Sequence, residues 1–105
     1  MIIRRGLHLT GVTLAALAAA PALASDESAR SLAATCANCH GTDGRGSGAE
    51  IPPLAGLPAE RIVAAFTDYK SGQRPATIMH QIAKGYTDEQ IRQISTYLAA
   101  LKPAR

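Results

Sequence analysis

Cys36-Ala37-Asn38-Cys39-His40 is a run of five residues that contains both cysteines of this 105-residue chain. The pattern C-x-x-C-H is the attachment signature of a c-type haem. On a helical turn, positions i and i+3 share a face, so Cys36 and Cys39 can both reach the vinyl groups of one porphyrin and form thioethers. His40 then projects from the end of the same turn, where its imidazole can bind the iron. The motif therefore predicts one covalently attached haem c.

Three other kinds of site use cysteine pairs at this spacing. A redox-active dithiol belongs to a thioredoxin-like alternation of strands and helices, which this sequence lacks. A structural zinc site needs four ligands, and two cysteines with one histidine leave the tetrahedron incomplete. A disulfide would suit an oxidising compartment but would leave His40 without a role. Haem attachment explains all three residues, and it predicts that no disulfide forms.

An iron held by His40 has a sixth coordination position, for which the sequence offers few ligands. Met79 is the only methionine after Met1, and His80 is the only histidine after His40. The alternatives are therefore a His40–Met79 pair, a His40–His80 pair and a five-coordinate iron. Methionine–histidine ligation raises the reduction potential relative to two histidines, as suits an electron carrier. We predict Met79 as the ligand and place His80, about 100° further round a helix, on the solvent side.

The first 24 residues predict a cleavable secretory signal peptide. Arg4-Arg5 forms a basic start, an apolar stretch spans residues 7–20, and Ala22-x-Ala24 matches a small-residue cleavage site. An uncleaved membrane anchor is the alternative, but the segment is alanine-rich and falls short of the roughly 20 strongly apolar residues that a span prefers. The expected organisation is a signal peptide over residues 1–24 and a monohaem domain over residues 25–105, located in the periplasm.

The basic composition of the chain comes largely from this predicted signal. The net charge is +3 for the whole chain and falls to +1 when Arg4 and Arg5 are removed with residues 1–24. No cluster of Lys and Arg interleaved with aromatic residues remains, which argues against a nucleic-acid partner. We also expect no membrane contact beyond export and no small-molecule substrate bound by this chain.

The remaining sequence predicts an all-α domain of four or so short helices. No alternating strand pattern is present, and helices are expected at residues 26–38, 58–70, 75–84 and 87–102. Glycines and prolines make residues 41–58 a loop, which is unusually long for so small a domain unless it wraps a cofactor. The chain has no tryptophan and only four aromatic residues, so a porphyrin would supply much of the missing core.

Apolar residues recur at helical spacing and predict which faces form the core. Ile62 and Phe66 share a face of the second predicted helix, and Ile78 and Ile82 share a face of the third. The last helix has the clearest start, because residues 87–90, Thr-Asp-Glu-Gln, have the form of a capping box. Its apolar stripe comprises Ile91, Ile94, Leu98 and Leu101.

These residues resemble the class I cytochrome c family, in which a short helical domain wraps one haem and the terminal helices cross near it. Residues 36–44 are similar to the haem-binding start of periplasmic cytochromes that often occur as tandem domains. Pro52-Pro53-Leu54-Ala55-Gly56 resembles the family segment that follows. The resemblance implies that the carbonyl of Pro52 accepts a hydrogen bond from His40 and orients its ring, with Pro53 as the alternative.

A narrower resemblance covers residues 69–72 and 77–86, which are similar to the cytochrome subunit of flavocytochrome c sulfide dehydrogenase. In that family the methionine that matches Met79 is the distal iron ligand. Many such subunits carry two haem domains, whereas this chain has one C-x-x-C-H motif. The resemblance implies that a flavoprotein (FAD) subunit oxidises sulfide and passes electrons to this chain, which is not an enzyme on its own and has no catalytic residues.

Two other functions compete with that one. A free-standing soluble shuttle would carry electrons to a terminal oxidase or another redox protein, using the same haem. A haem-based ligand sensor would need a weak or absent sixth ligand, and the presence of Met79 argues against it.

Overall fold

The structure is a computed structural model that describes residues 20–103. Its elements are the helices α1 (Ala20–Ala34), α2 (Ala37–His40), α3 (Ala59–Ser71), α4 (Met79–Lys84) and α5 (Asp88–Ala100), with a 3₁₀ turn, η1 (Thr42–Gly44). This part of the chain contains no strand, so the all-α prediction is confirmed. None of the helices in residues 20–103 is long and apolar enough to cross a bilayer.

The predicted signal peptide falls largely outside the described residues. Residues 1–19 are not described, and Ala20–Ala34 forms one helix that includes the predicted cleavage site after Ala24. The division into residues 1–24 and 25–105 therefore stays a prediction.

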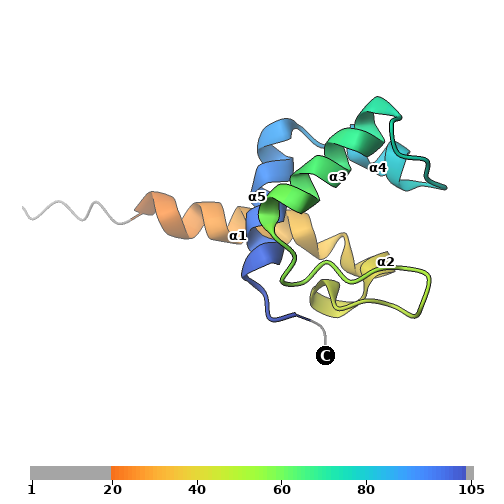
Figure 1. The fold of residues 1–105 in the computed structure, drawn as a ribbon. Helices are drawn as coiled ribbons and strands as arrows, with labels where there is room; N and C mark the ends of the chain where they lie inside the picture. Colours follow the sequence, from red (N-terminus) through yellow and green to blue (C-terminus); the bar gives the residue numbers. More distant parts are fainter. Residues whose placement is uncertain (1–19, 104–105) are drawn as a thin grey trace, which may run out of the picture.

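The first and last helices pack against each other, as the family resemblance implied. Helix α1 contacts α5, and α3 contacts both α4 and α5. Figure 1 shows α1 and α5 crossing, with α2 and α4 both on the right of that crossing. The core comprises Ala33, Ile62, Phe66, Ala83, Ile91, Ile94 and Leu98. Each fully buried Ile, Leu or Phe side chain here stabilises the fold by about 1.5–3 kcal/mol relative to an exposed one.

Helices α3 and α5 match their predictions closely because their ends are encoded locally. Helix α3 follows Pro58 and ends at Gly72, which adopts the left-handed conformation with φ 78°. The N-terminus of α5 has the complete capping box. The Thr87 hydroxyl accepts from the backbone N–H of Gln90 at 3.2 Å, and the Gln90 side chain accepts from the N–H of Thr87 at 2.9 Å.

The first predicted helix, residues 26–38, was wrong at both ends. Helix α1 begins at Ala20 and stops at Ala34, and a turn at Thr35 and Cys36 separates it from α2. The turn is tight, because the Cys36 N–H donates to the Ala33 carbonyl at 3.0 Å and the Thr35 hydroxyl donates to the Leu32 carbonyl at 2.9 Å. A threonine side chain that bonds to a carbonyl of the preceding turn competes with the helical ladder.

The core face predicted for the third helix, formed by Ile78 and Ile82, was also wrong. Ile78 is 54% exposed and Ile82 is 36% exposed, whereas Ala83 is completely buried. The reason is that α4 has only six residues and begins at Met79, so it turns a small side chain toward the core and leaves both isoleucines on the surface.

Candidate haem site

The C-x-x-C-H motif folds into a single helical turn, as its spacing predicted. Cys36 has helical backbone angles, and its carbonyl accepts from the N–H groups of Cys39 at 3.2 Å and His40 at 2.9 Å. Both cysteines are free thiols; Cys36 is half-buried and Cys39 is exposed. One turn therefore presents two thiols at i and i+3 with a histidine directly after them.

Burial raises the pKa of the Cys36 thiol. The Cys36 thiol is therefore protonated at neutral pH, and its sulfur packs as a small apolar group against the core cluster.

The imidazole of His40 is oriented by the loop that follows the motif. Its Nδ1 lies 2.8 Å from the carbonyl oxygen of Pro52, and because the carbonyl can only accept, Nδ1 carries the proton. The structure thus places this hydrogen bond at Pro52 rather than Pro53. In the neutral imidazole a proton on Nδ1 leaves Nε2 as the nitrogen that can bind a metal.

The loop is held under His40 by close backbone packing. The N–H of Gly46 donates to the His40 carbonyl at 2.6 Å, and the N–H groups of Leu54 and Ala55 both donate to the Gly44 carbonyl at 2.7 and 3.0 Å. Gly41 has φ 82°, and a Cβ atom added there would lie 2.0 Å from the Gly46 carbonyl oxygen. Only glycine at position 41 allows the loop to return beneath the histidine.

Met79 is the first residue of α4 and is half-buried against the same core cluster that Cys36 contacts. Helices α2 and α4, which carry the predicted proximal and distal groups, lie on one side of the α1–α5 crossing (Figure 1). The exposed apolar side chains of Ile78 and Ile82 flank Met79 on this element.

His80 is half-buried rather than on the solvent side, which corrects the prediction. Its Nδ1 is enclosed by protein atoms and has no hydrogen-bond partner within the described residues.

The donor set fits a covalently bound haem. Two thiols one helical turn apart, an adjacent imidazole with a free Nε2, and a thioether in a half-buried position are the groups that a histidine–methionine c-type haem requires. The assignments of Cys36 and Cys39 to the thioethers, of His40 and Met79 to the iron and of Pro52 to the orientation of His40 stay predictions.

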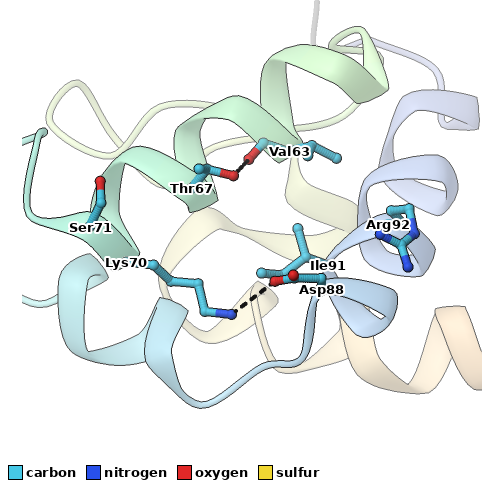
Figure 2. A pocket seen from close by; sticks show the side chains of 7 residues that line it. All are labelled: Val63, Thr67, Lys70, Ser71, Asp88, Ile91 and Arg92. Atoms are coloured by element: carbon cyan, nitrogen blue, oxygen red, sulfur yellow. Dashed lines mark hydrogen bonds and ion pairs between the residues drawn. The ribbon is translucent and has the colours of Figure 1, made fainter.

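Two surface cavities lie elsewhere. One, of about 450 Å³, lies between α3 and the start of α5 and is lined by Lys70 and Asp88 among others (Figure 2). The other, of about 640 Å³, lies between α1 and α5. Neither is lined by the cysteines, His40 or Met79.

Sequence reasoning missed one contact beside the motif. The hydroxyl of Tyr86 lies 2.9 Å from that of Thr35, the residue before Cys36. The two residues are 51 positions apart, and no local pattern indicates that they meet.

Comparison with known proteins agrees with this chemistry. The model of the cytochrome c family matches residues 25–102. The cytochrome subunit of sulfide dehydrogenase from Chlorobaculum tepidum is 46% identical over 70 residues, which cover 67% of this chain and 63% of the relative. Cytochrome c-554(548) from Halomonas halodenitrificans is 38% identical over 69 residues, covering 63% of this chain and 83% of the relative.

Among solved structures, cytochrome c4 from Acidithiobacillus ferrooxidans superposes with a TM-score of 0.63 at 34% identity, over 70% of this chain and 50% of that one. The chain thus spans less than two thirds of the sulfide dehydrogenase subunit and half of the cytochrome c4.

Proposed function

Because the chain belongs to the cytochrome c family, we propose that it is the cytochrome subunit that accepts electrons, one at a time, from a flavoprotein sulfide dehydrogenase. The chain is a c-type cytochrome electron carrier with covalently bound haem c and is not itself an enzyme. The haem-binding part of the proposal is supported by the hydrogen bond of 2.8 Å between His40 Nδ1 and the Pro52 carbonyl, and the partner is proposed from the sulfide dehydrogenase relative.

In this proposal each site residue has one role. Cys36 and Cys39 would hold the haem through thioethers, and His40 through Nε2 and Met79 through its sulfur would bind the iron. The Pro52 carbonyl holds the imidazole in one tautomer and increases its donor strength. The bound haem supplies a reversible one-electron couple between ferric and ferrous iron.

The ligand assignment is tested by replacing Met79 with Ala in the holoprotein. Iron–sulfur ligation gives the ferric protein an absorption band in the far red, so Met79→Ala should abolish that band. His80→Ala is the matched control, because it removes the neighbouring side chain of the same short helix and should leave the band in place. Persistence of the band in Met79→Ala would refute the assignment.

The partner is proposed from the sulfide dehydrogenase relative, which is 46% identical to this chain over 70 residues. Purification of the protein from its natural source should yield a larger, flavin-containing chain in the same complex. The runner-up is a free-standing shuttle, which the Halomonas relative favours because this chain covers 83% of its length. Recovery of the cytochrome alone, with no flavin, would favour the shuttle.

A surface for that partner is proposed at the loop before Met79. Residues 71–78 are all exposed, and the Arg74 guanidinium lies 5.4 Å from the centre of the Tyr69 ring, which holds the loop against the end of α3. Since the net charge after signal removal is close to zero, long-range steering is weak. Partner affinity should change little between low and physiological salt, and a steep loss would count against this surface.

We place the protein in the periplasm on the strength of its N-terminal sequence. Residues 1–24 combine a basic start, an apolar stretch and a small-residue cleavage site. The mass of the purified protein should correspond to a chain that begins at Ser25 and carries one haem. A mass that includes residues 1–24 would overturn cleavage at this point.

A further inference from the structure

We propose that Tyr86 is a positioning residue that ties the haem-attachment turn to the segment carrying Met79 and so keeps Met79 bound to the iron. The inference rests on the proposed role of Met79. Tyr86 lies two residues after α4 and one residue before the cap of α5, so it connects the distal segment to the core of the domain.

The hydroxyl of Tyr86 acts as the donor in the contact with Thr35. The two oxygens are 2.9 Å apart, and the single proton of the Thr35 hydroxyl is already donated to the Leu32 carbonyl, also at 2.9 Å. Tyr86 must therefore supply the proton between them. The bond joins the distal part of the chain to the residue immediately before Cys36.

Helix α3 holds the rest of Tyr86 in place. The Tyr86 ring packs edge-on against Phe66, with ring centres 6.1 Å apart and an angle of 76° between the planes. The Tyr86 carbonyl accepts a hydrogen bond of 2.7 Å from Lys70 Nζ. Lys70 also pairs with Asp88 at 3.2 Å, and Figure 2 shows this bond spanning from α3 to the start of α5. Tyr86 is thus fixed at its ring and its carbonyl, and its hydroxyl is free to restrain Thr35.

Met79 begins a short segment that packs against the core cluster and contacts α3, but most of that segment is exposed. The residues before it, 71–78, are exposed, and α4 itself has six residues, of which only Ala83 is buried. Helix α4 packs on α3, and the Tyr86–Thr35 bond just beyond its C-terminal end ties the same segment to the haem-attachment turn. Loss of the Tyr86–Thr35 bond should therefore increase the fraction of molecules in which the Met79 sulfur is displaced.

The test is the rate at which carbon monoxide binds to the ferrous holoprotein, because carbon monoxide enters only when the sixth position opens. Tyr86→Phe removes the hydroxyl but keeps the ring on Phe66 and the carbonyl on Lys70. We expect it to raise the binding rate by about two- to tenfold, the change that one net hydrogen bond makes to an opening equilibrium. Thr35→Val should give the same increase, and the double variant should give no more than either single one.

Controls separate this inference from its premise and from a loss of stability. Tyr97→Phe makes the same chemical change on α5, beside the cavity between α1 and α5, and should leave the rate unchanged. Thr35→Ser keeps a hydroxyl and should restore the wild-type rate. Met79→Ala sets the upper limit of the binding rate, and if it binds carbon monoxide no faster than wild type, the proposed role of Met79 as iron ligand fails.

If Met79→Ala binds carbon monoxide fast but Tyr86→Phe matches Tyr97→Phe, the positioning role of Tyr86 is overturned. The positioning role also fails if Tyr86→Phe lowers the free energy of unfolding in guanidinium while the carbon monoxide rate stays at the wild-type value. That result would make the bond merely structural.

Discussion

Gly41→Ala tests the close packing beneath His40, and Gly48→Ala is its matched control. Both glycines have positive φ, 82° and 84°, so alanine is conformationally strained at each. A Cβ at position 48 meets nothing within 4 Å, whereas one at position 41 would lie 2.0 Å from the Gly46 carbonyl oxygen and 2.7 Å from its carbonyl carbon. The difference between the two variants therefore reports the steric clash together with the unusual ψ of Gly41.

Gly48→Ala should lower the free energy of unfolding by about 1–2 kcal/mol, the usual cost of a left-handed non-glycine residue. Gly41 has ψ 164° in addition, a region that is almost exclusive to glycine and costs about 1–3 kcal/mol for other residues. Relief of the clash must also displace Gly46, whose N–H donates to the His40 carbonyl, and loss of that bond adds about 0.5–1.5 kcal/mol. We expect Gly41→Ala to cost about 3 kcal/mol or more in total.

The assay is guanidinium unfolding of the two holoproteins, followed by far-ultraviolet circular dichroism. The far-red absorption band is recorded in parallel, since movement of the loop that carries Pro52 should weaken the orientation of His40. Equal unfolding free energies for Gly41→Ala and Gly48→Ala would refute the reasoning, because the clash would then have no consequence.

Two further predictions concern α5. Ile94→Ala, at a completely buried position, should lower the free energy of unfolding by about 2–5 kcal/mol in a guanidinium titration. Thr96→Ala, at an exposed position of the same helix, should stay within about 0.5 kcal/mol of wild type. Hydrogen bonding from Arg92, with contacts of 2.7 and 3.2 Å, lowers the pKa of Glu89. The stabilisation by this carboxylate is therefore present above the ordinary pKa of Glu. It is lost as the pH falls through the lower pKa of the folded state. Glu89→Gln should therefore be less stable than wild type at neutral pH and equally stable in strong acid; a deficit that persists in acid would contradict the assignment to charge.

The parts of the fold that followed from the sequence are those encoded by neighbouring residues. The capping box at Thr87 and Gln90 and the left-handed Gly72 both act within a few positions, so pattern and structure agree there. The same holds for the attachment turn, because the i and i+3 spacing of Cys36 and Cys39 forms a helical turn without help from distant residues.

The parts that did not follow depend on contacts between distant segments. The break at Thr35 coincides with a bond to Tyr86, and the exposure of Ile78 and Ile82 follows from which face of α4 meets α3. A helical pattern shows that two isoleucines share a face but not whether protein covers that face. The half-burial of His80 escaped prediction for the same reason, because its surroundings come from other elements.

The pairing of α1 with α5 has a consequence for the order of events during biosynthesis. The ribosome completes His40 about 60 residues before it reaches the end of α5 at Ala100, which at roughly 5–20 residues per second is an interval of about 3–12 s. Until then α1 lacks the helix against which it packs, and the core cluster that Cys36 contacts is incomplete. Attachment of haem to the two cysteines within that interval would precede the packing of α1 against α5 and would therefore be a step in folding.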